Sequence, residues 1–401
     1  MHLINNAWCR VKDWDRGRAT TMKILVVHPH LNLVGGSEIL TKILVYELAG
    51  QGHEVIVVTK DRREDLFPDA PNVRFEFIKD IPELYKLSLR KMTTGKIMTL
   101  FYTLDHAIET HEPEVALVMI QEPIYAALIK FSRPGLGTAL YIHYPFEEEL
   151  TPQNLAKFID MYRFPDLYVS LYKVADLHMT NSNYTAKILH KRFGIESNVV
   201  YPAVDWKFFE NEPSLSDDRG NVIITVGRFV PHKRQDLMIE MFAKRIRPVV
   251  KDAQLVVVGM VDVRYEDYYA KLRQLSQETE GVELVDRSLT PEEMVEMYRR
   301  AKVYVHLRIG EHFGMAPVEA MSQATIPIVP RASGLAEMIT PGRNGYTFAN
   351  DEEIADYITK VLSMPTGDLA KMRLHCIRTA WYFNPDRFAK EILSYLRLMT
   401  E

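Results

Sequence analysis

Short runs of consecutive apolar residues recur along the chain and alternate with stretches of helical spacing. In the first half these runs lie at residues 23–30, 53–60, 115–120, 138–143 and 176–181. After residue 220 the pattern begins again, with runs at 221–227, 253–259, 282–285, 301–307 and 325–330. Such alternation is typical of parallel βαβ units whose strands are buried on both faces. We therefore expect an α/β fold with two doubly wound, Rossmann-like domains that face each other across a ligand-binding cleft.

Local composition sets the expected boundaries of the two domains. Residues 1–21 are polar and lack the apolar segment of a secretory signal, so they are interpreted as an N-terminal extension. The first domain is expected at 22–203. Residues 204–220 are rich in acidic, Ser and Gly residues and are predicted to be a linker. The second domain is expected at 221–384, followed by a C-terminal helix at 385–401.

Composition and charge exclude several classes of protein. The formal net charge is -4, so no general positive field would attract nucleic acid. Cys9 and Cys376 are the only cysteines, which argues against a disulfide scaffold and fits a reducing compartment. No uncharged apolar run reaches the roughly 18 residues of a membrane-spanning helix. We expect a cytoplasmic protein that does not bind nucleic acid.

Three segments fall at the carboxyl ends of predicted strands, where open α/β sheets bind ligands. In "NLVGGSE", Gly35 and Gly36 let backbone approach a ligand, although a plain tight turn fits the segment equally well. This segment lacks the GxGxxG spacing of a dinucleotide site. In "VGRFVPHKR", Arg228 and Lys233 suit a phosphate, although such cations are more often solvated. In "YIHYPF", His143 ends a strand, where a lone histidine is more often structural.

The stretch "RIGEHFGMAPVEAMSQA" carries two glutamates with seven residues between them. Glu311 lies on a loop with no evident cationic partner nearby in the sequence. Glu319 follows Pro317 in the first turn of a predicted helix, where a carboxylate is also favoured by the helix dipole alone. The backbone amides of residues 313–316 are expected to face the cleft with positive helix-end character, which suits a diphosphate.

These segments together resemble family 4 of the retaining GT-B glycosyltransferases. The resemblance rests on "EHFGMAPVEAM", "GRFVPHK" and "GLAEMITPGRNGYTF", and extends from about Met22 to the C-terminus. Within the family, "HPHLNLVGGSE", "YIHYPF", "MTNSNYTAKIL" and "VVYPAVD" are most similar to the mannosyltransferases that extend the dolichol-linked oligosaccharide. Those enzymes have a glycine-richer loop, usually with Glu-Arg where this chain has Ser37 and Glu38.

The resemblance implies a role for each candidate residue of the second domain. Arg228 and Lys233 match the cations that hold the donor diphosphate. Glu311 matches the carboxylate that binds hydroxyls of the donor sugar, and Glu319 matches the one that binds both ribose hydroxyls of the nucleotide. Three further residues fall where backbone amides contact the donor sugar and phosphate: Phe313, Gly314 and Met315.

For the first domain, the resemblance implies that His143 lies at the donor sugar near the reacting carbon. Gly35 and Gly36 match the loop that closes over the diphosphate. The C-terminal helix at 385–401 is expected to cross back onto the first domain, as in the family, with a hinge near residues 203–205.

The implied activity is the transfer of a hexose, best assigned as mannose, from GDP-mannose or another nucleotide diphosphate sugar to a lipid-linked saccharide. Two cations and a helix start make a divalent metal unnecessary, and the "DWD" at Asp13 to Asp15 is read as chance because it precedes the first strand. Three alternatives stay open: transfer from a UDP-sugar to a soluble acceptor, a related nucleotide-sugar epimerase or hydrolase, and a non-catalytic sugar-binding relative.

A basic, acid-free stretch between Glu83 and Asp105 bears on the acceptor. It contains four cations interleaved with apolar residues: Lys86, Arg90, Lys91 and Lys96. One interpretation is a helix that packs its apolar side on the sheet and solvates its charges. The other is peripheral contact with an anionic membrane, where a polyprenyl-diphosphate acceptor would be met.

Overall fold

The computed structural model describes residues 21–78, 94–145, 169–210, 213–215 and 219–400. The first domain is built on a parallel sheet with strand order β5-β3-β1-β6-β7-β8-β9. Its strands are β1 (Lys23–Val27), β3 (Glu54–Thr59), β5 (Val73–Phe77), β6 (Val115–Val118), β7 (Gly137–Ile142), β8 (Leu177–Thr180) and β9 (Asn198–Val199). A separate pair is formed by β2 (His30–Leu31) and β4 (Asp61–Arg62). Helices α2 (Gly36–Gly50), α3 (Thr94–His111), α4 (Ile124–Ser132) and α7 (Asn183–Phe193) and the 3-10 turn η5 (Tyr172–Val174) complete the domain.

The second domain repeats this plan with strand order β12-β11-β10-β13-β14-β15. Its strands are β10 (Val222–Val226), β11 (Gln254–Val258), β12 (Val282–Val285), β13 (Val303–Val305), β14 (Ile326–Pro330) and β15 (Tyr346–Phe348). Its α-helices are α8 (Gln235–Met241), α9 (Glu266–Glu278), α10 (Pro291–Arg300), α11 (Ala316–Ser322), α12 (Asp351–Leu362) and α13 (Thr366–Trp381). Short helical segments are η7 (Pro231–Lys233), η8 (Phe242–Ile246), η9 (Val263–Tyr265) and η10 (Gly334–Met338).

Buried apolar strands explain why both sheets lie inside their domains. The residues of β1 from Ile24 to Val27 are fully buried, and β6 and β14 are buried along their whole length. Strand order reverses direction beside β1 and β6 in one sheet and beside β10 and β13 in the other. These are the switch points at which doubly wound sheets open a crevice for ligands. The predicted α/β class with two Rossmann-like domains is confirmed.

Several short strands were not predicted from the sequence, and two of them, β5 and β15, lie at edges of the sheets. In β5 the sequence "VRFEF" mixes charged with apolar residues, and the strand lies half-buried at the edge of the first sheet. In β15 only three residues pair, at the edge of the second sheet. Edge strands lack the continuous apolar run that identifies a central strand, so the pattern does not reveal them.

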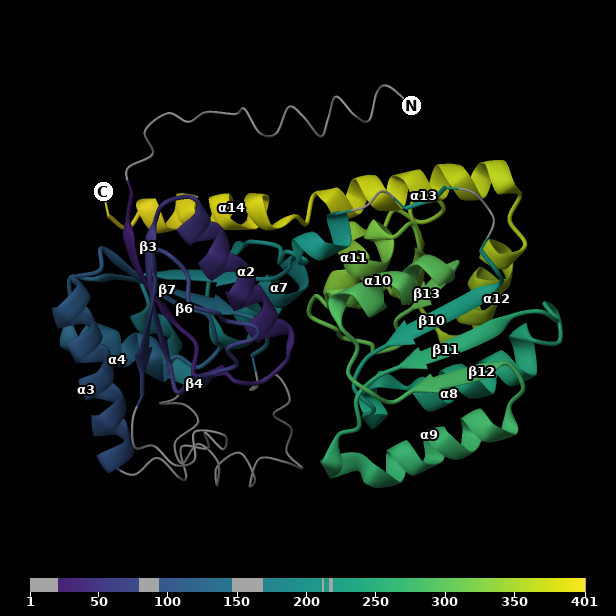
Figure 1. The fold of residues 1–401 in the computed structure, drawn as a ribbon, viewed down its shortest axis with the longest axis horizontal. Helices are drawn as coiled ribbons and strands as arrows, with labels where there is room; N and C mark the ends of the chain where they lie inside the picture. The colour runs from purple at the N-terminus through teal and green to yellow at the C-terminus, as the bar shows by residue number, and fades with distance from the viewer. Residues whose placement is uncertain (1–20, 79–93, 146–168, 211–212, 216–218, 401) are drawn as a thin grey trace.

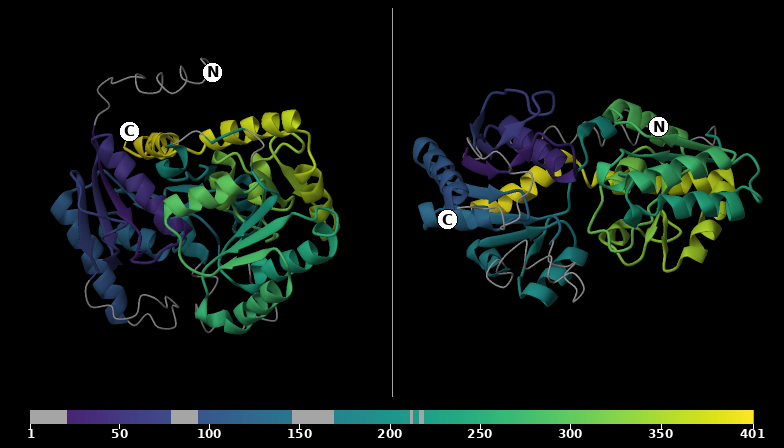
Figure 2. Two further views of the ribbon diagram at one scale, coloured as in Figure 1. Left: turned by 45° about the vertical axis from the view of Figure 1, so that its right-hand side comes forward. Right: turned by 90° about the horizontal axis from the view of Figure 1, so that it is seen from below.

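Two connections join the domains (Figure 1). The segment expected as a linker begins with a 3-10 helix, η6 (Trp206–Phe209), whose Phe208 and Phe209 are buried in the core of the second domain. The chain returns through α14 (Pro385–Arg397), which packs against α2 and buries its apolar face in the core of the first domain. Figure 2 shows the same two-lobed arrangement from two other directions.

Candidate active site

Two helix starts, one from each domain, lie against each other. Gly36 begins α2 in the first domain, and Met315 precedes α11 in the second. A Cβ atom placed on Gly36 would lie 3.5 Å from the Met315 Cε atom. The predicted glycine loop of the first domain therefore lies against the predicted donor loop of the second domain.

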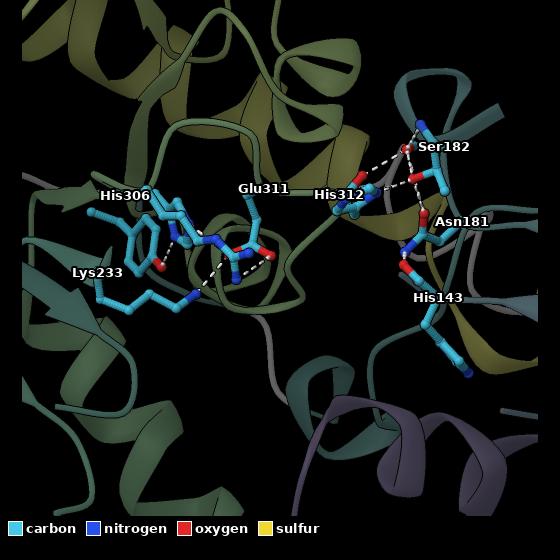
Figure 3. A network of polar contacts seen from close by, with 10 residues as sticks. His143, Asn181, Ser182, Lys233, His306, Glu311 and His312 are labelled. Atoms are coloured by element: carbon cyan, nitrogen blue, oxygen red, sulfur yellow. Dashed lines mark hydrogen bonds and ion pairs between the residues drawn. The ribbon is translucent and has the colours of Figure 1, made fainter. Parts of the chain in front are cut away.

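Glu311 is the centre of a charged cluster in the second domain. Its Oε2 atom lies 2.6 Å from the Lys233 Nζ atom, and the His306 Nε2 atom donates to the same oxygen over 3.2 Å. The Arg308 guanidinium lies 3.8 Å from Oε1. Figure 3 shows Lys233 and His306 converging on Glu311. His306 and Arg308 lie in the loop after β13, and Lys233 lies in η7. The expectation that Glu311 has no cation nearby in the sequence was wrong, because Arg308 is only three residues away.

This cluster fixes the ionisation of Glu311. Burial opposes ionisation of its carboxyl group, but the Lys233 ammonium and the hydrogen bond from His306 outweigh burial, so the pKa of Glu311 lies well below its usual range. Gly314 lets the loop fold tightly around the carboxylate: its φ is 75°, and a Cβ atom there would lie 3.3 Å from the Glu311 Cγ atom. An ionised carboxylate that shares one oxygen with a lysine keeps the other available to sugar hydroxyls.

Glu319 lies in the first turn of α11 in a different environment. The Tyr298 hydroxyl donates to its Oε2 atom over 3.0 Å. Burial raises the pKa of Glu319 to about 7. Within the described residues no cation is paired with this carboxyl group. It is therefore suited to neutral hydroxyl partners rather than to a charged group.

The helix start between the two glutamates offers unused donors. Among the described residues, the backbone amides of Phe313, Gly314 and Met315 donate no hydrogen bond. The side chain of Phe313 is buried against Tyr201 and Phe383 at the domain junction, so only its backbone faces the loop. This is the arrangement expected of a diphosphate-binding helix start.

The two predicted phosphate-binding cations differ in their surroundings. The Lys233 side chain is 21% exposed and is committed to Glu311. The Arg228 side chain is 58% exposed, and its guanidinium lies 3.4 Å from an oxygen of Asp262. Asp262 is held more closely by Arg264, with an oxygen–nitrogen distance of 2.6 Å. Arg228 is therefore free to swing towards a ligand at little cost, whereas Lys233 is already in place.

His143 directly follows β7 in the first domain and is uncharged. Its Nε2 atom donates to the Met119 carbonyl over 3.0 Å, and its ring packs 4.9 Å from the Tyr141 ring. Burial lowers the pKa of His143 to about 4. Because Nε2 carries the hydrogen, Nδ1 is an acceptor near neutral pH. The side chain can accept a hydrogen bond from a hydroxyl group, but it cannot donate a proton as an acid there.

Two buried residues near the glycine loop, His28 and Glu38, form a pair to which the sequence analysis gave no role. The Glu38 carboxylate folds back onto the start of α2: a Cβ atom on Gly35 would lie 2.5 Å from its Oε2 atom. The His28 Nε2 atom lies 3.8 Å from Glu38 Oε1. Burial raises the pKa of Glu38 and holds that of His28 well below its usual range. Glu38 thus already occupies much of the positive helix end that Gly35 and Gly36 were expected to offer an anion.

Two domain models from known protein families account for most of the chain. The Glycosyltransferase Family 4 model matches residues 34–208, and the Glycosyl transferases group 1 model matches residues 207–380. The chain belongs to the family 4 glycosyltransferases. The resemblance inferred from the sequence is therefore confirmed, and the GT-B architecture with it.

Named relatives lie within the same family as this glycosyltransferase. A GDP-Man:Man(3)GlcNAc(2)-PP-Dol alpha-1,2-mannosyltransferase of Neurospora crassa is 27% identical over 68% of this chain and 58% of the relative. The enzyme of the same name from Dictyostelium discoideum is 23% identical over 97% of this chain and 87% of the relative. The glycosyltransferase thus spans less than two thirds of the Neurospora protein. A crystal structure of a glycosyltransferase from Rickettsia africae has the same fold, with a TM-score of 0.72 over 95% of this chain and 99% of that one, at 14% identity.

Proposed function

We propose that this glycosyltransferase transfers mannose from GDP-mannose to a polyprenyl-linked saccharide, with retention of the anomeric configuration. The observation that carries the proposal is the Glu311 centre, where an ionised carboxylate and Lys233 lie beside unused helix-start amides. A sugar diphosphate needs hydroxyl acceptors and anion donors side by side. The choice of mannose and of the acceptor class rests on the names of the relatives.

In this proposal each part of the site holds one part of the donor. Glu319 accepts the two ribose hydroxyls, Lys233 and Arg228 bind the diphosphate, and Glu311 binds the mannose hydroxyls. As the bond from the anomeric carbon to the phosphate oxygen breaks, negative charge grows on the leaving diphosphate and is met by the two cations and the helix-start amides. The acceptor hydroxyl attacks from the same face, and its proton passes to the departing phosphate.

We also propose that this transfer needs no divalent metal, because the cations and amides supply the positive charge. Among the described residues, no group of three or more His, Cys, Asp or Glu side chains is placed to hold a metal ion. Transfer in the presence of a chelator at full rate would support this assignment.

A lipid-linked acceptor implies contact with a membrane surface. No helix in the described ranges is long and apolar enough to cross a bilayer. The basic stretch proposed for membrane contact lies largely outside the described residues, including Lys86, Arg90 and Lys91, and the side chain of Lys96 is likewise not described. In the described part of this stretch, α3 exposes Tyr102, and α4 exposes Phe131 in the same domain; these exposed aromatic rings support a peripheral contact. We expect salt-sensitive binding to anionic vesicles.

The test is a donor panel followed by a transfer assay. GDP-mannose, GDP-glucose, UDP-glucose and UDP-N-acetylglucosamine are compared by thermal shift and then incubated with a short polyprenyl-diphosphate saccharide. A ligand that binds only the folded state stabilises it by about 2.7 kcal/mol at a hundred times its Kd. We expect the largest shift and the only lipid-linked product with GDP-mannose. Transfer from a UDP-sugar alone would contradict the donor assignment.

A further inference from the structure

His312 belongs to the second domain, but its side chain packs among residues of the first domain. It directly follows Glu311 in the chain and is only 3% exposed. Its ring packs edge-on against the rings of Tyr144 and Tyr184, with centroids 4.8 Å and 5.6 Å away. Both tyrosines belong to the first domain. Figure 3 shows His312 reaching away from the Glu311 cluster towards Asn181 and Ser182.

The hydrogen bonds around His312 run in one consistent direction. The Thr185 hydroxyl donates its single hydrogen to Asn181 Oδ1 over 2.7 Å. Thr185 Oγ1 must therefore accept from His312 Nδ1, which lies 2.8 Å away. Asn181 Nδ2 in turn donates to the backbone carbonyl of His143 over 2.8 Å. An unbroken series of hydrogen bonds thus joins the residue beside Glu311 to the backbone of His143.

The main chain of the same loop is held as well. Ser182 Oγ donates to the His312 carbonyl over 2.6 Å. From the second domain, the Glu337 carboxylate accepts from the backbone amides of Asn183 and Tyr184, over 3.0 Å and 2.6 Å. Two segments of the second domain, one at His312 and one at Glu337, therefore hold the start of α7 by hydrogen bonds. Gly310 and Gly314, on either side of Glu311 and His312, both have φ of 75°. Within its own domain the loop is held by two backbone bonds, from the Gly310 amide to the Ala332 carbonyl and from the Gly334 amide to the Glu311 carbonyl.

We propose that His312 and Thr185 are positioning residues that set Glu311 and His143 relative to each other across the cleft. Glu311 and His312 are neighbours with opposed side chains, so a loop that seats His312 in the first domain also directs Glu311 to the donor sugar. The same series of hydrogen bonds holds the backbone of His143, which directly follows β7. Glu311 and His143, one from each domain, therefore keep their relative positions only while the two domains are in contact. This inference rests on the proposed function, in which both residues meet the donor sugar.

Thr185 allows a matched test because the hydroxyl can be removed without changing the shape of the side chain. Thr185→Val removes the hydroxyl that accepts from His312 Nδ1 and donates to Asn181 Oδ1, whereas Thr185→Ser keeps it. We expect Thr185→Val to lower kcat about tenfold. We also expect it to remove most of the gain in affinity of GDP-mannose over bare GDP, because that gain comes from the sugar contacts. Thr185→Ser should stay within about twofold of wild type in both measurements.

Calorimetry with bare GDP serves as the internal reference, because the proposed nucleotide contacts do not involve His312 or Thr185. GDP affinity should be unchanged in Thr185→Val, although the loss of buried hydrogen bonds will lower its Tm. A variant with lower Tm and lower GDP affinity but a normal ratio of GDP-mannose to GDP affinity would show a merely structural role and overturn the proposal. Wild-type kcat in Thr185→Val would overturn it too, while leaving the proposed function intact.

His312→Phe gives a second route, because it fills the space between the tyrosines and removes the N–H group. In a double-mutant cycle, the loss in His312→Phe/Thr185→Val should equal that of either single variant. Additive losses would contradict the assigned hydrogen bond. If the wild-type protein shows no transfer from any nucleotide sugar, the proposed function fails. The affinity ratio of GDP-mannose to GDP still decides whether the contact between His312 and Thr185 positions Glu311.

Discussion

The two sides of the cleft use opposite electrostatic designs. On the second domain, Lys233 and Glu311 form a close ion pair, with a nitrogen–oxygen distance of 2.6 Å, and more cations surround it. On the first domain, burial keeps His28 and His143 uncharged and raises the pKa of Glu38. The second domain therefore presents fixed charges, whereas the first domain presents uncharged histidines and backbone.

The difference indicates where charge changes during the reaction. Ion pairs on the second domain are arranged before the substrate arrives, so they can meet a diphosphate with little reorganisation. On the first domain, the uncharged His143 can accept a hydrogen bond from a sugar hydroxyl without attracting the diphosphate away from the cations. If this comparison is correct, loss of charge on the second domain will cost more than loss of a polar group on the first.

The largest effect is expected from neutralising Lys233. Lys233→Met keeps most of the volume but removes the charge that meets the leaving diphosphate. Loss of one such preorganised donor costs about 3 kcal/mol, roughly a hundredfold in kcat. Steady-state transfer assays measure the change, with Lys244→Met as control, since the Lys244 side chain is 74% exposed and lies 3.5 Å from Glu240 on the same helical segment. Equal, small losses in the two variants would remove Lys233 from the diphosphate site.

A smaller effect is expected from His143 on the first domain. His143→Ala removes one acceptor for a sugar hydroxyl, and loss of such a hydrogen bond costs roughly 1 to 2 kcal/mol, or about tenfold in kcat. Because its pKa is lowered to about 4, the wild-type pH–rate profile should show no step from this group between pH 6 and 8. The exposed His190 on α7 is the control position. A loss as large as that of Lys233→Met would contradict the comparison of the two sides.

The smallest effect concerns the pH dependence of nucleotide binding. With a pKa of about 7, Glu319 is mostly protonated at pH 6 and mostly ionised at pH 8. Ribose hydroxyls donate to the ionised form, so GDP should bind about tenfold more tightly at pH 8 than at pH 6 through this group. Glu319→Gln should lose that component, and the exposed Glu296→Gln should keep it. The same pH dependence in Glu319→Gln and wild type would exclude a ribose contact.

The central strands and the charged motifs could be predicted because both leave a local signature. Continuous apolar runs identify buried parallel strands, and Glu311 and Glu319 stand out by their spacing within one segment. His312 is one residue from Glu311, yet its role was missed because its partners Thr185 and Tyr144 lie in the other domain. No sequence pattern marks a contact between residues more than a hundred positions apart.

For the two cations, the sequence suggests a likeness that the structure does not bear out. Arg228 and Lys233 look alike in the sequence, but only the fold shows that Asp262 draws Arg228 aside while Glu311 holds Lys233. The folding of the Glu38 carboxylate over Gly35 could not be predicted either, because helix-start glycines are usually read as an open anion site. In both cases the outcome depends on tertiary contacts rather than on residue type.

The most direct test of this account is calorimetry of GDP and GDP-mannose on two variants, Glu311→Gln and Glu319→Gln. The account predicts that Glu319→Gln weakens both ligands equally, because the ribose is common to them. It predicts that Glu311→Gln leaves GDP binding within about twofold of wild type and removes most of the extra affinity of GDP-mannose. If both variants weaken both ligands to the same extent, Glu311 and Glu319 do not read separate parts of the donor, and the central assignment of the site is wrong.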